Sequence, residues 1–374
     1  MLTLSYIAVV FWASALLNII LNLLLLGRLR RKEMDHFPFV SVIVPARNEE
    51  RAIERMLRAL LAQEYPEFEV IVVDDRSTDS TGSIVDRIAS EDGRLVAIHG
   101  AETPAGWLGK PFALHQGSER ARGEMLLFVD ADVHYAPQTL RTAVEHIEAT
   151  GRAMVALLPH FECRSLWEHA LMPALPMAPF SFPLWINEFV PLTYLAIGAG
   201  TGNLIRRSAY DATGGHESLR DAVVDDVGLA HHMRRSGFST GIARTERLVS
   251  VRMYHGFREI VSGFTKNAFP SLGRSYVLAV IGLAIMLIAH IGPYVFAIAG
   301  VRAALIALAL LYLGRLIFHA AQRYSIAAVL LHPLTAIGWI WIIARSTWIV
   351  GIRRELHWRG RTYDPSRTRF GAER

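Results

Sequence analysis

A chain of 374 residues that is 52% hydrophobic and 20% charged is too apolar for an ordinary soluble enzyme and too charged for a protein made only of membrane spans. Its formal net charge of +5 suits anionic lipid headgroups, but no basic stripe with interleaved aromatic residues is present, which argues against nucleic acid as a partner. One cysteine, Cys163, excludes an internal disulfide and a cysteine-rich zinc site.

The first predicted element is a membrane anchor. Residues 4–26 carry no charge over a length that can cross a bilayer. This run is longer than the apolar core of a signal peptide, and it lacks both a preceding basic residue and a small-residue cleavage site, so we expect a retained helix. Four basic residues follow the anchor: Arg28, Arg30, Arg31 and Lys32. Because positively charged flanks of a span stay in the cytoplasm, we expect the central region to be cytoplasmic.

Strands and helices are then predicted to alternate. Apolar runs typical of buried strands end at Val44, Val73 and Val129, and another lies within 94–100. Helical patterns cover about 50–63, 109–122 and 137–149, and a further one begins near Asp79 or Ser80. Such alternation predicts an α/β fold with a mostly parallel, doubly wound sheet, in which ligands bind beyond the carboxyl ends of the strands.

Four acidic side chains are expected at that edge of the sheet. The Asp-x-Asp pattern of residues 130–132 is weak evidence by itself, because aspartate is common in turns. Four carboxylates at one edge, however, repel one another unless a cation or hydrogen-bond donors gather there. A ligand or metal site is therefore favoured over a simple turn at Asp74, Asp75, Asp130 and Asp132.

Five stretches, in this order and spacing, resemble the family 2 glycosyltransferases of the GT-A fold. They are SVIVPARNEE (41–50), VVDDRSTDST (72–81), GWLGKPFAL (106–114), FVDADV (128–133) and VVDDVGLAHHMRRSG (223–237), and the resemblance extends from residue 38 to about 270. The anchor, the later apolar block and HWRGRTY (357–363) look most like the membrane-bound branch that glycosylates lipids. That branch includes ceramide, carotenoid-type and hopanoid-associated glycosyltransferases, of which the last group is nearest.

The resemblance implies how the nucleotide-sugar donor is bound. Asp75 is expected to take the uracil edge of a UDP-linked sugar. Pro45, Arg47 and Glu49 are expected to shape the same nucleotide pocket.

The resemblance also implies a metal site for Mg²⁺ or Mn²⁺. Asp130 should face the ribose or the water shell of the metal, and Asp132 should bind the metal directly. This is physically reasonable, because a hard divalent cation takes oxygen ligands and neutralises charge on a leaving diphosphate. Lys110 is expected to touch the donor phosphate or sugar; the alternative is an exposed lysine at the start of a helix.

The catalytic base is expected in the last motif. The family usually has Glu-Asp there with the aspartate as base, and this chain has Asp225-Asp226, which makes Asp226 the predicted base and Asp225 a neighbour that raises its pKa. The alternative is that one of the two caps the helix that ends at Gly237.

A glycine-rich segment, AIGAGTGNLIRRSAY (196–210), is expected to line the acceptor and sugar pocket. It lacks the Gly-Lys-Ser/Thr of a phosphate loop, and its alternative interpretation is a tight bend before a strand. The residues expected to let a ligand approach the backbone are Gly200, Thr201, Gly202 and Asn203.

Two further segments are expected at the membrane surface. Residues 165–195 are apolar and rich in proline, which suits an interfacial segment with Trp167, Trp185 and Tyr194 better than a spanning helix; core packing is the alternative. The second segment is an amphipathic helix, one face of which carries Phe257, Ile260, Val261 and Phe264. Its Arg258 and Lys266 are candidates for a diphosphate contact.

Three further spans are predicted near 277–300, 302–321 and 325–350. An odd number of spans after a cytoplasmic domain places the C-terminus outside, yet the basic residues Arg353, Arg354, Arg359 and Arg361 favour the inside. The expected organisation is an anchor with basic flank (1–32), a cytoplasmic catalytic domain (33–255), an amphipathic interfacial helix (256–275), spans (276–352) and a basic tail (353–374).

The predicted function is inverting transfer of a sugar from a nucleotide-diphosphate sugar to the hydroxyl of a membrane lipid at a bacterial inner membrane. One rival keeps the chemistry but uses a polyprenyl phosphate or a polysaccharide as acceptor, although the Gln/Arg-x-x-Arg-Trp motif of many processive members is missing. The other rival is an inactive membrane scaffold that binds nucleotide-sugar. The lipid, the sugar and the oligomeric state are left open by the sequence.

Overall fold

The computed structural model describes residues 1–29, 33–190, 192–354, 356–358 and 361–363, the last two ranges and Tyr194 by their backbone alone. The chain forms two compact units. The helical unit comprises the described parts of Met1–Leu26, Phe161–Ile186 and Met253–Ser366, and the sheet unit comprises those of Gly27–His160 and Asn187–Arg252. Some of the predicted features lie outside the described residues. They are the basic residues Arg30, Arg31, Lys32 and Arg359, and the side chains of Tyr194, Arg361 and the stretch 357–363.

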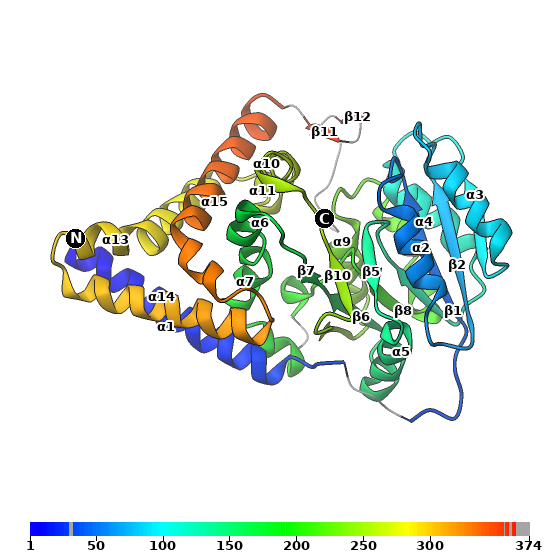
Figure 1. Cartoon of the computed structure of the whole chain (residues 1–374), viewed down its shortest axis with the longest axis horizontal. Coiled ribbons are helices and arrows are strands. Elements are labelled where there is room, and N and C mark those ends of the chain that lie inside the picture. Colours follow the sequence, from blue (N-terminus) through cyan, green and yellow to red (C-terminus); the bar gives the residue numbers. More distant parts are fainter. Residues whose placement is uncertain (30–32, 191, 355, 359–360, 364–374) are drawn as a thin grey trace. The chain divides into compact units, whose positions relative to one another are not determined.

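The sheet unit is built on a seven-stranded, mostly parallel sheet (Figure 1). Its spatial order is β3-β2-β1-β4-β8-β6-β9, and β8 runs antiparallel to both of its neighbours. The strands are β1 (Val40–Ala46), β2 (Phe68–Asp74), β3 (Leu95–His99), β4 (Met125–Phe128), β6 (Met154–Leu158), β8 (Asn203–Arg206) and β9 (Thr240–Arg244). This arrangement confirms the α/β prediction, and it brings the ends of β1, β2 and β4 to one edge.

Helices pack against this sheet where the sequence predicted them. α4 contacts β1 and β2, and α5 contacts β6 and β8. The helices of the unit are α2 (Ile53–Leu61), α3 (Thr81–Glu91), α4 (Gly109–Arg120), α5 (Thr139–Thr150), α8 (Arg207–Ala212), η3 (Gly215–Leu219) and α9 (Asp225–Arg235), with a short turn η2 (Thr193–Leu195). All residues of β2 are buried, as expected of a central parallel strand covered on both faces.

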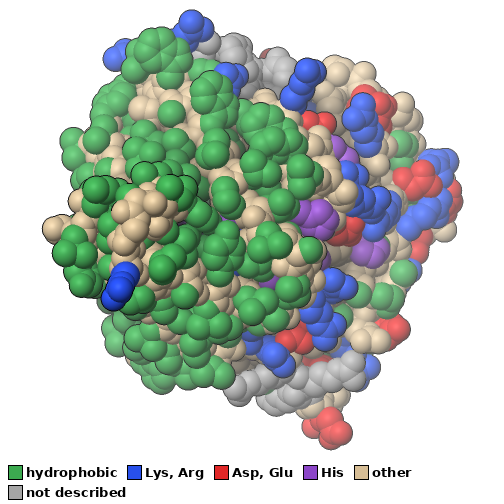
Figure 2. All heavy atoms as spheres, turned by 60° about the vertical axis from the view of Figure 1, so that its left-hand side comes forward, with side chains coloured by type: hydrophobic (Ala, Val, Ile, Leu, Met, Phe, Trp, Pro, Cys, Tyr) green, Lys and Arg blue, Asp and Glu red, His purple; other side chains and the backbone are tan. Residues whose placement is uncertain are grey.

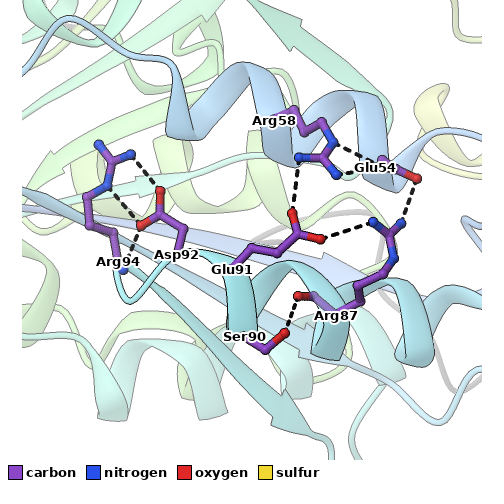
Figure 3. Close-up of polar contacts among 7 residues, drawn as sticks. All are labelled: Glu54, Arg58, Arg87, Ser90, Glu91, Asp92 and Arg94. Atoms are coloured by element: carbon purple, nitrogen blue, oxygen red, sulfur yellow. Dashed lines mark hydrogen bonds and ion pairs between the residues drawn. The ribbon is translucent and has the colours of Figure 1, made fainter.

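Ion pairs on the outer faces of α2 and α3 join these neighbouring helices (Figure 3). Glu54 pairs with Arg58 and Arg87, and Glu91 pairs with the same two arginines. Because all four side chains are exposed, the network contributes little to stability and mainly keeps this surface soluble.

The prediction missed the strands that follow residue 130. A small second sheet has the order β5-β10-β7, formed by β5 (Val133–Tyr135), β10 (Val249–Val251) and β7 (His160–Phe161). These strands, like β6 and β9, are only two to five residues long, and such short apolar runs carry no periodic signal.

The helical unit contains, within the described residues, four helices long and apolar enough to cross a membrane. They cover Leu2–Leu25, Tyr276–Ile298, Arg302–Ala321 and Ala327–Ile352, close to the predicted spans. Along the chain they comprise α1 (Leu2–Leu25), α12 (Tyr276–Ile285), η4 (Met286–Ile291), α13 (Gly292–Ile298), α14 (Arg302–Ala321), η5 (Ala327–Leu331), α15 (His332–Ser346) and η6 (Thr347–Ile352). A hairpin of β11 (Leu356–Trp358) and β12 (Arg361–Tyr363) follows.

The helix α1 packs along α14 through small residues. Gly314 of α14 faces Leu16 and Ile19 of α1, and the buried side chains of α1 recur every three or four residues. Small residues let helix backbones approach closely, which is how spans associate in lipid. Large hydrophobic side chains remain exposed on all four of these helices, among them Val10, Val277, Val280, Leu305 and Ile337. Figure 2 shows a broad hydrophobic surface.

In the described part of the proline-rich segment 165–195 the chain forms short helices and no spanning helix, which agrees with its proline content. They are α6 (Leu166–Leu171), α7 (Ala174–Phe180) and η1 (Leu184–Glu188), followed by η2. Trp185 is held by α1, since its backbone N–H donates to Asn22 Oδ1 at 2.8 Å and its indole donates to Asn18 Oδ1 at 3.2 Å. Trp167 packs on Phe257 with ring centroids 4.5 Å apart.

The predicted amphipathic helix is α10 (Gly256–Thr265), followed by α11 (Ala268–Ser271). Ile260, Val261 and Phe264 of its apolar face are buried, and α10 packs on α6 and α15. Most of this face is therefore covered by protein within the helical unit, which is a different placement from an apolar face turned toward lipid.

Candidate active site

The loops that follow β1 and β2 are hydrogen-bonded to each other at the sheet edge. Asn48, which adopts a left-handed conformation, donates its N–H to Ser77 Oγ at 3.0 Å and accepts from Thr78 N at 2.8 Å. Glu49 N donates to Thr81 Oγ1 at 2.8 Å. Asparagine tolerates this backbone conformation well, and the result is a shaped edge between two parallel strands.

The two acids at the end of β2 differ in their surroundings. Asp74 Oδ1 accepts from Ser77 N at 3.1 Å, so this carboxylate stabilises the loop. Arg47 Nη1 donates to the carbonyl oxygen of Asp75 and lies 3.8 Å from Asp75 Oδ2. The structure thus brings together, at one edge, the residues predicted for the nucleotide: Pro45, Arg47, Glu49 and Asp75.

A second group of predicted site residues meets around Lys110, at the start of α4. Its ammonium Nζ lies 2.8 Å from Asp130 Oδ1 and 3.1 Å from Asp225 Oδ1. These carboxylates come from the end of β4 and the first turn of α9, almost a hundred residues apart in sequence. The side chain of Lys110 is 22% exposed, which excludes the alternative of a solvated surface lysine.

Charge in this cluster is strongly coupled. Burial raises the pKa of Asp225 to about 6, the neighbouring charges of Asp226 and Asp130 raise it as well, and Lys110 opposes the shift. Burial lowers the pKa of Lys110, but the three carboxylates outweigh that effect and raise it well above its usual value. Lys110 therefore stays protonated at neutral pH, stabilised by the carboxylates around it.

The predicted base lies in the first turn of α9. Val224 is the N-cap residue, and no side chain caps the helix, so the capping alternative for Asp225 or Asp226 is wrong. Asp226 Oδ1 accepts from Val227 N at 2.9 Å, and its other oxygen faces the segment at Gly200. Carboxylates in a first turn interact favourably with the positive end of the helix.

The glycine-rich segment passes close to Asp130, beyond the end of β4, and to Asp226, at the start of α9. A Cβ atom added to Gly198 would lie 1.8 Å from the carbonyl oxygen of Asp226, and one added to Gly200 would lie 2.4 Å from Asp130 Oδ2 and 3.4 Å from Asp226 Oδ2. Only glycine permits these approaches. Asn203 then ties the segment to α9 by donating to the Asp226 carbonyl at 3.3 Å.

The same segment does not place all four of its predicted residues in the pocket. Gly200 and Asn203 line a small pocket with Lys110, Asp130 and both acids of α9. Thr201 is buried, and its hydroxyl donates to Leu157 O at 2.9 Å, while a Cβ on Gly202 would lie 2.3 Å from the hydroxyl of Tyr135. Thr201 and Gly202 therefore support the segment from behind.

A divalent cation is compatible with the acids at the end of β4. Asp132, two residues beyond Asp130, is partly buried and lies outside the pocket that Lys110 lines. No group of three or more histidine, cysteine, aspartate or glutamate side chains in the described residues could hold a metal alone. Mg²⁺ commonly uses one or two carboxylates together with substrate phosphates, so Asp130 and Asp132 fit a metal that arrives with the donor.

Sequence reasoning missed His216 in this pocket. Its Nδ1 lies 2.8 Å from the Tyr210 hydroxyl, and its ring packs against Phe128 at 4.6 Å. Burial lowers the pKa of His216 to about 3, an effect to which the charge of Lys110 adds, so the imidazole is neutral. A lone histidine after Gly214-Gly215 offers no motif, which is why only the fold reveals it.

The two predicted diphosphate contacts lie in the helical unit. Arg258 is exposed on α10, and Lys266 is partly buried at its end. The acids and Lys110 belong to the sheet unit.

Comparison with known proteins agrees with this architecture. Residues 41–214 match the family model described as glycosyl transferase family 2. These residues include the strands β1 to β8, Lys110 and the acids at the ends of β2 and β4.

Two curated relatives are glycosyltransferases. The chain is 25% identical over 244 residues to a 4,4'-diaponeurosporenoate glycosyltransferase from Staphylococcus haemolyticus, covering 64% of this chain and 63% of that protein. It is 27% identical over 282 residues to a protein of the same name from Staphylococcus aureus, covering 71% of this chain and 69% of that protein. The chain thus spans about two thirds of the length of these relatives.

One solved structure shares the fold. A mannosyltransferase from Pyrobaculum calidifontis, in complex with GDP-Man and Mn²⁺, superposes with a TM-score of 0.52 at 22% sequence identity. The superposition covers 93% of this chain and 99% of the mannosyltransferase chain.

Proposed function

We propose that this chain, whose residues 41–214 form a family 2 glycosyltransferase domain, transfers a sugar from a nucleotide-diphosphate sugar to the hydroxyl of a membrane lipid. The observation that carries the proposal is the convergence of Lys110, Asp130, Asp225 and Asp226 beneath Gly200, in a chain that also has four helices able to span a membrane. The names of the curated relatives support a lipid-like acceptor, and the cytoplasmic side of a bacterial inner membrane is the proposed place.

In the proposed reaction, Asp226 is the base. Its carboxylate accepts the proton of the acceptor hydroxyl as the oxygen attacks the anomeric carbon of the sugar. The bond from that carbon to the diphosphate breaks on the opposite face, so the configuration inverts. Asn203 and Gly198 fix the backbone of Asp226, which positions its carboxylate for this step.

Donor binding is assigned to the edge of β1, β2 and β4. Asp75 is proposed to recognise the base, in a pocket shaped by Pro45, Arg47 and Glu49, with uracil as the favoured base. Lys110 is proposed to contact the diphosphate or the sugar, since its ammonium already lies among the carboxylates at this edge.

A divalent cation, Mg²⁺ or Mn²⁺, is proposed to bind Asp132 and Asp130. When bound, it would neutralise negative charge on the leaving diphosphate. The fold neighbour was solved with Mn²⁺, but the proposal for this chain depends on its own paired carboxylates at the end of β4.

The test is donor turnover by the purified full-length protein in bacterial lipid extract. A panel of radiolabelled nucleotide-sugars is supplied with Mg²⁺ or Mn²⁺, with and without EDTA, to wild type, Asp132→Ala, Asp226→Asn and the control Asp211→Asn, whose side chain is exposed on α8. We expect label to enter the organic phase with wild type and Asp211→Asn and to stay in the aqueous phase with EDTA or either site variant. Label that enters lipid undiminished with Asp226→Asn would refute the proposed base and favour a phosphate acceptor, which needs little base. Binding of donors without any turnover would support the inactive scaffold.

A further inference from the structure

An arginine is buried inside one of the candidate spans. Arg315 lies in α14, about 20 Å along a helix of roughly 30 Å at 1.5 Å per residue, so it is well inside the apolar stretch. It is 2% exposed, and its Nε and Nη2 atoms have no hydrogen-bond partner among the described residues. A charged side chain at such depth is expensive to maintain, and such residues generally mark functional sites.

The two unsatisfied atoms form the edge of the guanidinium that binds carboxylates. Elsewhere in this chain, Arg94 holds Asp92 through this same edge, with Nε at 3.1 Å and Nη2 at 2.7 Å (Figure 3). Arg122 uses the same two nitrogen atoms to hold one oxygen of Glu69, Oε2, with Nε at 3.0 Å and Nη2 at 2.8 Å. Two parallel N–H donors match the two oxygens of a carboxylate or phosphate. Arg315 therefore has the edge that binds an oxyanion, and the described residues supply no oxyanion to it.

The candidate spans cannot supply that anion themselves. The sequences of Leu2–Leu25 and of Tyr276–Ile352 contain no aspartate or glutamate. No salt bridge to Arg315 occurs among the described residues. Since an uncompensated charge in a low-dielectric interior is strongly unfavourable, a counter-ion from outside the protein is favoured.

Polar side chains from neighbouring helices gather beside Arg315. His332 of α15 hydrogen-bonds through Nε2 to His290 at 3.1 Å and through Nδ1 to the Tyr294 hydroxyl at 2.9 Å, which in turn lies 2.9 Å from the hydroxyl of Tyr312. Tyr294 and Tyr312 are within electrostatic reach of the Arg315 charge. His290 lies in the π-helical turn η4, a local irregularity that is frequent at functional sites.

A second buried side chain on the same face of α14 also has an unsatisfied atom. His319 follows Arg315 by four residues and so lies one turn further along the same face. It is fully buried; its Nδ1 lies 2.9 Å from Ser325 O, while its Nε2 has no partner among the described residues. Arg315 and His319 together thus present three buried nitrogen atoms without partners.

We propose that Arg315 binds the oxyanion of a membrane lipid, a carboxylate or a phosphate, between the helices of the helical unit. The lipid source follows from depth, because a water-soluble anion would have to enter an apolar stretch, whereas a lipid headgroup reaches it from the bilayer with its chains still in hydrocarbon. His319 and the hydrogen-bonded group of His290, Tyr294, Tyr312 and His332 supply polar surroundings for the headgroup. This site is distinct in sequence and chemistry from the sugar-transfer residues of the sheet unit.

The test measures lipid binding and needs no turnover, so its outcome is independent of the proposed function. Full-length protein in dodecyl maltoside is titrated with oleate, dioleoylphosphatidylglycerol, dioleoylphosphatidylcholine or inorganic phosphate, and native mass spectrometry counts the bound molecules. Wild type is expected to retain one oleate or phosphatidylglycerol at concentrations that leave phosphatidylcholine and inorganic phosphate unbound. Preference between the first two distinguishes a carboxylate from a phosphate headgroup.

Variants assign the binding to Arg315. Arg315→Met is expected to weaken anionic-lipid binding tenfold or more, as expected for the loss of charge-assisted hydrogen bonds. Arg315→Lys keeps the charge but loses the two-donor edge, so its affinity for anionic lipid is expected to lie between those of wild type and Arg315→Met. It replaces Arg315→Met as the test if that variant does not fold. The matched control is Arg345→Met, because Arg345 is an exposed arginine of α15. The proposal would be overturned if a folded Arg315 variant bound anionic lipid as well as wild type does, or if Arg345→Met lost as much binding as Arg315→Met. It would also be overturned if wild type retained phosphatidylcholine as well as it retains the anionic lipids. Displacement of the bound lipid by inorganic phosphate would show that the anion does not come from a lipid.

Discussion

The ammonium of Lys110 lies 3.1 Å from the carboxylate of Asp225, although 115 positions separate the two residues. Asp225 is buried, and Lys110 reaches it from the start of α4 while also contacting Asp130. One cation thus holds together the ends of β4, α4 and α9. This geometry explains how three chain segments form one pocket.

Replacing Lys110 with methionine is expected to reduce both stability and turnover. Breaking one partner of a buried ion pair typically costs about 3–5 kcal/mol, because the remaining charge is left uncompensated. The double variant Lys110→Met/Asp225→Asn should regain most of the lost thermal stability, since the buried charge at Asp225 is then removed as well. Turnover should stay low in the double variant if Lys110 also contacts the donor. A double variant as active as wild type would limit Lys110 to a structural role.

Stability should fall with rising pH because of Asp225. Its pKa is raised from 3.8 to about 6, so between these values the folded chain binds more protons than the unfolded chain. The free energy of unfolding therefore decreases as pH rises through this window and is constant above it, as far as this group is concerned. Thermal unfolding of wild type and Asp225→Asn from pH 4 to 8 checks this: the Tm of wild type minus that of the variant should fall up to about pH 6 and then level off. A difference that rises with pH would contradict the assignment.

Gly200→Ala is expected to lower turnover at least tenfold. The new methyl group would lie 2.4 Å from Asp130 Oδ2, so either the segment or the carboxylate must move. Overpacking of this kind costs roughly 1–3 kcal/mol. Gly93→Ala is the matched control, because a Cβ at Gly93 meets nothing within 4 Å. Turnover and Tm measured for both variants would contradict the argument if they changed alike.

Arg47→Lys is expected to weaken donor binding with little change in fold. Arg47 donates from Nη1 to the carbonyl oxygens of Asp75 and Arg76, and a flexible lysine ammonium does not reproduce the direction that the planar guanidinium gives these donors. Calorimetric titration with UDP should show an affinity loss of about tenfold, in keeping with one or two hydrogen bonds to a charged group. Arg51→Lys, at an exposed position in the loop between β1 and α2, is the control. Unchanged UDP affinity in Arg47→Lys would remove this arginine from the nucleotide pocket.

The sequence determined much of this protein by itself. The spans were predictable because an apolar run of about twenty residues with few charges has few stable alternatives to a membrane helix. The first four parallel strands were predictable because each ends in a recognisable polar loop. The edge acids Asp75 and Asp130 followed from the rule that parallel strands share a carboxyl edge, whereas Arg47 was predicted from the family resemblance.

Tertiary structure alone decided the rest. Whether Thr201 faces the pocket or the core depends on strand direction, and β8 is antiparallel in an otherwise parallel neighbourhood. The ring contact of His216 with Phe128 and the Lys110–Asp225 pair join segments far apart in sequence, and no local pattern encodes such contacts. Arg315 illustrates the same limit: its place in an apolar run was visible in the sequence, but the unsatisfied edge of its guanidinium appears only when the helices pack, because burial and hydrogen-bond partners are properties of the folded chain.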